Sequence, residues 1–168
     1  METAETKSCV LDQDTIKRKL RRMALQIAEE NSNEESLVIA GIHGNGEVVA
    51  KCLVQELKEF SGLQLDVVSI QLNKKNPKEV YIQGTVNMND RVVIIVDDVA
   101  DTGRTMLYAL KPFLDTHPRK IQTLVLVERS HKLFPIQNDY VGLSLTTTLQ
   151  EHIVVETEGG EIRGAWLY

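Results

Sequence analysis

The segment between positions 92 and 105 carries side chains suited to binding a phosphorylated sugar. Adjacent carboxylates, Asp97 and Asp98, follow a run of five β-branched residues, and Thr-Gly-Arg-Thr occupies positions 102–105. Threonine hydroxyls, a glycine that permits close backbone approach and a helix N-terminus all favour a phosphate. Carboxylates repel a phosphate, but they suit the hydroxyl groups of a sugar or a divalent cation. Together these groups predict a ribose 5-phosphate ligand.

Residues of these types also occur where a strand leads into a helix and no ligand binds. Acidic and Ser/Thr/Gly residues are common helix caps at such junctions, although the whole string together favours a ligand. A P-loop is excluded, since Gly-x-x-x-x-Gly-Lys-Ser/Thr does not occur in the sequence. The segment 41–46, Gly-Ile-His-Gly-Asn-Gly, has the wrong glycine spacing for a dinucleotide-binding fingerprint.

The pattern of the chain predicts an α/β fold in which a doubly wound, mostly parallel sheet is flanked by helices. Residues 92–96 are too uniformly apolar for a solvated face, which indicates a central parallel strand. Strands and helices alternate through the middle of the chain, as right-handed crossovers require. The expected strands are 36–41, 65–72, 80–82, 92–96 and 121–127, the expected helices 12–30, 47–57 and 106–114, and the expected closing hairpin 152–157 with 162–167. Residues 128–150 are expected to be irregular.

Two loops of this fold should lie together. The segments 41–46 and 97–105 each lead from a strand into a helix. Because ligands of such sheets bind at the carboxyl ends of the strands, both loops should face one crevice. That arrangement suits a ligand with phosphate groups at both ends.

Length and composition set the class of protein. The 168 residues are expected to form one domain, 1–168, and the net charge of −5 argues against wholesale wrapping of nucleic acid. Cys9 and Cys52 lack the spacing of metal ligands, so reduced thiols are expected. The sequence has neither a run of 18 apolar residues nor the apolar core of a signal peptide, which predicts a cytoplasmic protein without a membrane partner.

These motifs resemble those of the type I phosphoribosyltransferases, whose signature is two apolar residues, paired acids and then Thr-Gly before a helix. Within that superfamily the chain is most similar to the bifunctional pyrimidine-operon regulator and uracil phosphoribosyltransferase group. The likeness extends over nearly the full length, including the segments 121–132 and 135–142. A small hood, formed by about 1–12 and 128–168, is implied, as are Mg²⁺ and assembly as a homodimer or higher oligomer.

The resemblance also implies the residues of the site. Phosphoribosyl pyrophosphate would be bound by Asp97, Asp98, Val99, Ala100, Asp101, Thr102, Gly103, Arg104 and Thr105, with Asp97 and Asp98 on the ribose hydroxyls, directly or through Mg²⁺. Pyrophosphate contacts would come from His43, Gly44, Asn45 and Lys74, the last in a covering loop at 73–79. Tyr140 would stack on the base and Val141 would bond its edge through the backbone.

The chemistry implied is displacement of pyrophosphate by a ring nitrogen of a nucleobase. Uracil is favoured, and a purine remains the alternative. Asp101 resembles the acid of hypoxanthine-guanine phosphoribosyltransferases that exchanges a proton with the base, and is the predicted catalytic residue. Glu128 stands where those enzymes carry a lysine, which argues against a purine.

Two further functions remain open. Residues 17–22, Lys-Arg-Lys-Leu-Arg-Arg, place five cations on the first helix. Such a run is most often a solvated face, but it could meet RNA phosphates, as regulators of this group do. A catalytically silent sensor that binds nucleotides through the same residues is a third possibility.

Overall fold

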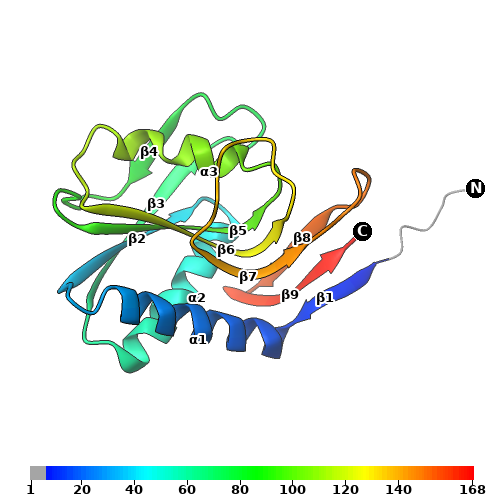
Figure 1. Ribbon diagram of the computed structural model, residues 1–168, viewed down its shortest axis with the longest axis horizontal. Coiled ribbons are helices and arrows are strands. Elements are labelled where there is room, and N and C mark those ends of the chain that lie inside the picture. The colour runs from blue at the N-terminus through cyan, green and yellow to red at the C-terminus, as the bar shows by residue number, and fades with distance from the viewer. Residues whose placement is uncertain (1–6) are drawn as a thin grey trace, which may run out of the picture.

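The computed structural model describes residues 7–168 as a six-stranded sheet with helices on both faces and a three-stranded sheet beside it (Figure 1). The strands are β1 (Ser8–Asp12), β2 (Ser36–Ile42), β3 (Gln64–Leu72), β4 (Val80–Gln83), β5 (Val92–Ala100), β6 (Lys120–Arg129), β7 (Tyr140–Leu145), β8 (Ile153–Glu158) and β9 (Glu161–Leu167). The helices are α1 (Gln13–Glu30), α2 (Asn45–Phe60), α3 (Arg104–Ala109) and the 3₁₀ turn η1 (Lys111–Phe113).

The larger sheet confirms the expected doubly wound fold. Its strand order is β4-β3-β2-β5-β6-β7, and every neighbouring pair is parallel except β3 and β4. The order steps outward in both directions from β2 and β5, so the chain reverses its winding between these two strands. Gly41 of β2 pairs with Val96 of β5, which brings the carboxyl ends of both strands to one place.

Alternation along β5 divides the core into two layers. Val92, Ile94 and Val96 are fully buried against α1 and α2, whereas Val93 and Ile95 are buried against α3 and η1. With both faces covered, β5 has no solvated side, as its uniformly apolar sequence predicted.

The smaller sheet has the antiparallel order β1-β9-β8, and we call it the hood because it includes parts of both segments predicted to form one. Its β8–β9 hairpin matches the hairpin expected at the end of the chain. The predicted hood segment 1–12 is described only from residue 7, so positions 1–6 lie outside the described residues. The chain from 128 onward is not all hood, because β7 pairs with β6 in the larger sheet. The expectation that 128–150 are irregular was therefore wrong for 140–145.

Two element boundaries differ from expectation around the acids. β5 continues to Ala100, so Asp97 and Asp98 belong to the strand and not to a loop after it. The helix expected at 106–114 is α3 followed by η1, and Pro112 lies in the first turn of η1. A proline in a helix interior removes a backbone donor and clashes with the preceding turn, which accounts for this division.

Gly46, at the start of α2, lets this helix approach β5 closely. A Cβ atom at position 46 would lie 2.9 Å from the carbonyl oxygen of Val96 and 3.1 Å from Oδ1 of Asp97. We expect Gly46→Ala to lower the free energy of unfolding by about 1–3 kcal/mol, the usual cost of overpacking. Gly62→Ala is the matched control, since a Cβ there meets nothing within 4 Å. Equal urea midpoints for the two variants would contradict this close packing.

Candidate active site

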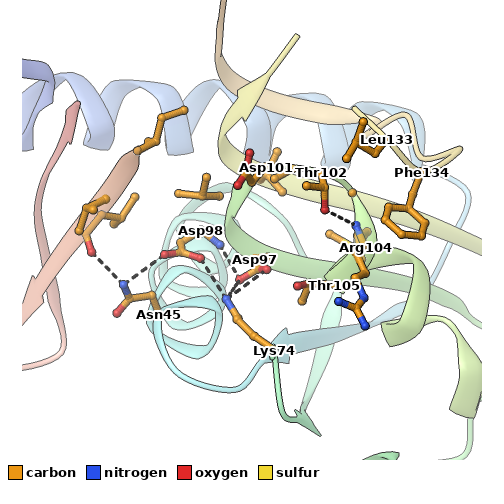
Figure 2. Close-up of a pocket in the computed structure, with 18 residues that line it drawn as sticks. Asn45, Lys74, Asp97, Asp98, Asp101, Thr102, Arg104, Thr105, Leu133 and Phe134 are labelled. Carbon is orange, nitrogen blue, oxygen red and sulfur yellow. Dashed lines mark hydrogen bonds and ion pairs between the residues drawn. The ribbon is translucent and has the colours of Figure 1, made fainter. Parts of the chain in front are cut away.

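A cavity of about 600 Å³ opens where β5 ends, and it combines the predicted phosphate turn with the acid pair (Figure 2). The residues 97–105 line it without a gap. Its remaining walls come from Met106, which follows this run, and from five other parts of the chain: Asn45, Lys74, the β6 residue Val125, Leu133 with Phe134, and the β8 residues Ile153, Val154 and Val155. The hood thus closes one side of a cavity whose floor is the carboxyl end of the larger sheet.

The acid pair is buried. Asp97 is 2% exposed and Asp98 is 7% exposed, and the backbone N–H of Asp98 donates to Oδ1 of Asp97 over 2.9 Å. Burial and the neighbouring charge of Asp98 raise the pKa of Asp97 well above its usual value, although Lys74 acts in the opposite direction. Two carboxylates held this way attract a cation strongly.

Lys74 is the cation that meets them in this structure. Its Nζ lies 3.3 Å from Oδ1 of Asp97 and 3.6 Å from Oδ1 of Asp98 (Figure 2). Partial burial lowers the pKa of Lys74, but the two aspartates outweigh that effect and raise it. Lys74 comes from the segment predicted to cover the site, and the structure brings it to the acid pair.

Asn45 connects three parts of the site. Its Nδ2 donates to Oδ2 of Asp98 over 3.1 Å and to the carbonyl oxygen of Val155 over 2.8 Å, and its Oδ1 accepts from Thr157 over 3.0 Å. The first residue of α2 therefore orients Asp98 and ties it to the hood strand β8. Sequence reasoning predicted a pyrophosphate contact for Asn45 and missed this positioning role.

The predicted phosphate turn is held from both sides. Gly103 has a φ of +87°, a conformation that favours glycine, and Oγ1 of Thr102 accepts from the backbone N–H of Arg104 over 3.2 Å. The carbonyl oxygen of Thr102 accepts from the N–H groups of Leu133 and Phe134, over 3.0 and 3.1 Å. The segment after β6 thus fixes the turn before α3 begins.

Asp101, the predicted catalytic acid, lies between the acid pair and the phosphate turn. Its side chain is 55% exposed, and its Oδ1 is 2.6 Å from Nη1 of Arg129 at the end of β6. The carboxylate of Asp101 therefore has access to the cavity while Arg129 holds it from behind.

The donor set fits Mg²⁺, which the resemblance implies. Oδ1 of Asp98 is buried and has no hydrogen-bond partner among residues 7–168, so it is an acceptor that a cation would satisfy. Over that same range no cluster of three or more His, Cys, Asp or Glu side chains is positioned to hold a metal. Two carboxylates completed by water and substrate oxygens are the usual protein share of a Mg²⁺ site.

The structure places Tyr140 in the core, which corrects its predicted stacking on the base, whereas the predicted backbone contact of Val141 stays a prediction. Tyr140 is 2% exposed in the core below the sheet, where its hydroxyl donates to Glu30 over 2.5 Å, so it has no face to offer a base. Burial and Glu30 both raise the pKa of this hydroxyl. The carbonyl oxygen of Val141 accepts from Arg22 of α1 over 2.8 Å. Neither residue lines the cavity.

His43 and Gly44 lie next to the cavity without lining it. Nδ1 of His43 is 3.3 Å from Oε2 of Glu47, and the N–H of Gly44 donates to the same oxygen over 3.1 Å. Gly44 has a φ of +90°. Their predicted pyrophosphate contacts stay predictions.

The apolar walls were missed by sequence reasoning. Leu133 and Val154 are exposed apolar side chains on the cavity, and Ile153 and Phe134 are partly buried there. The hairpin of β8 and β9 was expected, but its docking against β5 was not. Large apolar side chains that remain solvent-exposed at a cavity are the walls on which a flat ring packs.

The basic run on α1 is partly neutralised. Arg21 lies 3.2 Å from Glu59, and Arg22 donates to Val141 and to Gln26. Lys17 and Arg18 are exposed. Among the described residues, no helix is long and apolar enough to cross a membrane.

A doubly wound sheet that ends its central strand in a buried acid pair and a Thr-Gly turn, beneath a small antiparallel hood, has the architecture of the type I phosphoribosyltransferases. The model of the phosphoribosyl transferase domain matches residues 8–158, and the chain belongs to this family.

Relatives and solved structures agree with that assignment. The chain is 38% identical to the Bifunctional protein PyrR of Deinococcus radiodurans over 93% of its length and 92% of the relative's. It is 36% identical to that of Streptococcus suis, over 87% of each protein. The fold is similar to the hypoxanthine phosphoribosyltransferase of Trypanosoma cruzi, with a TM-score of 0.75 and 18% identity over 83% of this chain and 82% of that one. A hypoxanthine-guanine phosphoribosyltransferase from Bacillus anthracis gives 0.71 and 22%, over 89% and 87%.

Burial of Asp97 makes a prediction about stability and pH. With its pKa raised, folded Asp97 binds a proton at pH values where the unfolded chain has lost it, so folding weakens as pH rises through the raised pKa. In the presence of a chelator, Asp97→Asn should therefore raise the melting temperature at pH 8, by about 2–4 °C for each kcal/mol gained. The gain should disappear near pH 4.

Asp115→Asn, at an exposed aspartate, should leave the melting temperature unchanged at both pH values. A melting temperature for Asp97→Asn that is unchanged or lower at pH 8 would show that Lys74 fully compensates the buried charge.

Proposed function

We propose that the protein transfers the 5-phosphoribosyl group of phosphoribosyl pyrophosphate to a nucleobase, releasing pyrophosphate, and that uracil is the preferred base. One observation carries the proposal: a buried acid pair and a Thr-Gly-Arg-Thr turn face one cavity at the carboxyl edge of the sheet. The resemblance to the pyrimidine-operon regulator and uracil phosphoribosyltransferase group favours uracil.

The residues of the cavity divide the substrate among them. The turn 102–105 would receive the 5-phosphate through threonine hydroxyls and backbone N–H groups. Asp97 and Asp98 would bind the ribose hydroxyls, either as hydrogen-bond acceptors or through a bound Mg²⁺. Lys74, displaced from the acids when they take up the sugar, would then be available to the negative pyrophosphate. When bound, Mg²⁺ would supply charge that stabilises the departing pyrophosphate.

The chemical step joins a ring nitrogen to the anomeric carbon as the bond to pyrophosphate breaks, and the proton of that nitrogen is lost. Asp101 lines the cavity and is the proposed catalytic residue: its carboxylate would accept a hydrogen bond from a ring N–H of the base, and the departing pyrophosphate would take up the proton released by the reacting nitrogen. The apolar walls at Leu133 and Ile153 would exclude the water that could otherwise capture the sugar cation. Catalysis then consists mainly of alignment and charge stabilisation.

A 6-oxopurine is the alternative base. Asp101 resembles the acid of the hypoxanthine-guanine enzymes, and the solved structures similar in fold are named hypoxanthine or hypoxanthine-guanine phosphoribosyltransferases. Against a purine, position 128 is a glutamate where the purine enzymes carry a lysine. The carboxylate of Glu128 is 2.8 Å from Nζ of Lys132 and accepts from Asn138, so it cannot supply the positive charge of that lysine.

Turnover with each base tests the proposal. The protein is incubated with phosphoribosyl pyrophosphate, Mg²⁺ and one of uracil, hypoxanthine or guanine, and pyrophosphate release is measured. We expect release with uracil and its loss, by at least about a hundredfold, when Asp97→Asn and Asp98→Asn are combined, because two charge-assisted contacts are removed. Asp115→Asn is the control with an equal charge change per site.

Release with a purine base alone would select the alternative. If none of the bases gives pyrophosphate release while a nucleotide binds tightly, the protein is a silent sensor. Full activity of the double variant would contradict the role assigned to the acids.

A second proposed activity is binding of messenger leader RNA through α1. The family resemblance and the exposed cations Lys17 and Arg18 favour it. Affinity for the RNA should fall as salt rises, with a logarithmic slope of about −0.7 for each phosphate contacted. Neutralising Lys17, Arg18 and Lys19 with glutamine should reduce that slope by about two, whereas Lys58→Gln on α2 should not. An affinity independent of salt would contradict this activity.

A further inference from the structure

Behind Asp101 the cavity continues into a second, smaller space of about 60 Å³. Val99, Asp101 and Ile153 line both spaces, and Arg129, Glu151 and His152 line only the smaller one. A flat ring held between the apolar side chains of Val99 and Ile153 would therefore direct one edge at the carboxylate of Asp101 and the guanidinium of Arg129.

We propose that Arg129 positions Asp101 as a fixed hydrogen-bond acceptor, and that the two side chains together select bases that carry, away from the reacting nitrogen, a ring N–H next to an exocyclic oxygen. This inference rests on the proposed function and specifies the substrate class of the same site.

Asp101 needs such a partner. It is the first residue after β5, and its side chain is 55% exposed, so by itself it would sample several rotamers. The register of β5 and β6 pairs Ala100 with Glu128, which puts residues 101 and 129 side by side. Nη1 of Arg129 is 2.6 Å from Oδ1 of Asp101, and the arginine side chain is only 17% exposed. A nearly buried guanidinium thus fixes an exposed carboxylate.

Arg129 is itself held from the other side. Its Nε donates to Oγ1 of Thr147, and Nη2 donates to the carbonyl oxygen of Thr148. Glu151 in turn accepts from the N–H of Thr148 over 2.6 Å. Three of the five N–H groups of the guanidinium are used in these contacts and the Asp101 pair, which leaves two that can donate.

The chemistry of the pair determines which edge fits. An ionised carboxylate only accepts and a guanidinium only donates. On the edge away from the reacting nitrogen, uracil, hypoxanthine and guanine each carry a ring N–H beside an exocyclic oxygen, which matches an acceptor beside a donor. Cytosine and adenine present an amino group beside an unprotonated nitrogen, the reverse order. Such a mismatch leaves buried polar groups unpaired, and sites of this kind discriminate strongly.

The main alternative is that Arg129 only anchors the 146–151 segment to β6. Equilibrium binding and steady-state kinetics distinguish the two roles. Binding of UMP and CMP is measured calorimetrically for the wild type, Arg129→Gln, Arg129→Lys, Asp101→Asn and the double variant Arg129→Gln with Asp101→Asn. Arg119→Gln is the matched control, because it removes an exposed arginine that pairs with Glu34 at the opposite end of β6.

We expect the wild type to prefer UMP over CMP by at least tenfold and Arg129→Gln to lose most of that preference. Arg129→Lys should keep part of it, and Arg119→Gln all of it. Adding Asp101→Asn to Arg129→Gln should reduce UMP affinity by less than about a further threefold, since paired residues act as one unit. With turnover, kcat/KM for the base should fall about 10–100-fold in Arg129→Gln, while KM for phosphoribosyl pyrophosphate stays within about twofold.

The inference would be overturned if the wild type did not prefer UMP, or if Arg129→Gln kept the wild-type preference. It would also be overturned by additive losses of UMP affinity in the double variant, or by equal kinetic losses for the base and for phosphoribosyl pyrophosphate. Failure of the proposed function is separate, since it would be seen as absent pyrophosphate release in a protein that still discriminates UMP from CMP.

Discussion

Two like charges buried side by side are the constraint around which this site is built. Isolated carboxylates in such a position would be costly, and the surroundings of Asp97 and Asp98 reduce that cost. A lysine reaches in from a distant loop, an asparagine from α2 donates to Asp98, and Gly46 allows the start of that helix to come within contact of the strand. The fold thus maintains an arrangement that is unfavourable by itself and that the proposed cation or sugar would relieve. This explains why a substitution that stabilises the protein is expected at the same position that the proposed reaction requires.

The rest of the site is organised by the direction of the strands. Because β2, β5 and β6 are parallel, their carboxyl ends bring Asn45, Asp101 and Arg129 to a single edge although they are far apart in sequence. The hood then adds the apolar walls that the sheet edge lacks. Contacts between these layers are specific hydrogen bonds and not only packing: Asn45 donates to β8, and Thr102 accepts from the segment after β6. Asn45 and Thr102 are therefore each held by at least two elements of the fold.

The sequence was sufficient to predict the central strand, the doubly wound sheet and the juxtaposition of two loops, since these follow from local apolar patterns and the geometry of parallel strands. Tyr140 shows where that reasoning fails. An aromatic residue in a segment without an evident strand was interpreted as a hood residue, yet Tyr140 and Gly142 are both buried, in the alternating pattern of a strand. The contacts of Arg129 and the docking of Ile153 depend on residues distant in the sequence, and no local pattern reports such pairings.

Lys74 lies in the connection between β3 and β4, and β4 is a four-residue strand at the end of the sheet with one neighbouring strand. The connection can therefore be displaced at the expense of few backbone hydrogen bonds, while the buried layers around β5 stay intact. We therefore expect displacement of this connection to cost less free energy than unfolding of the domain. Substitutions in residues 73–79 could therefore change the rate at which a ligand enters without changing the free energy of unfolding of the domain.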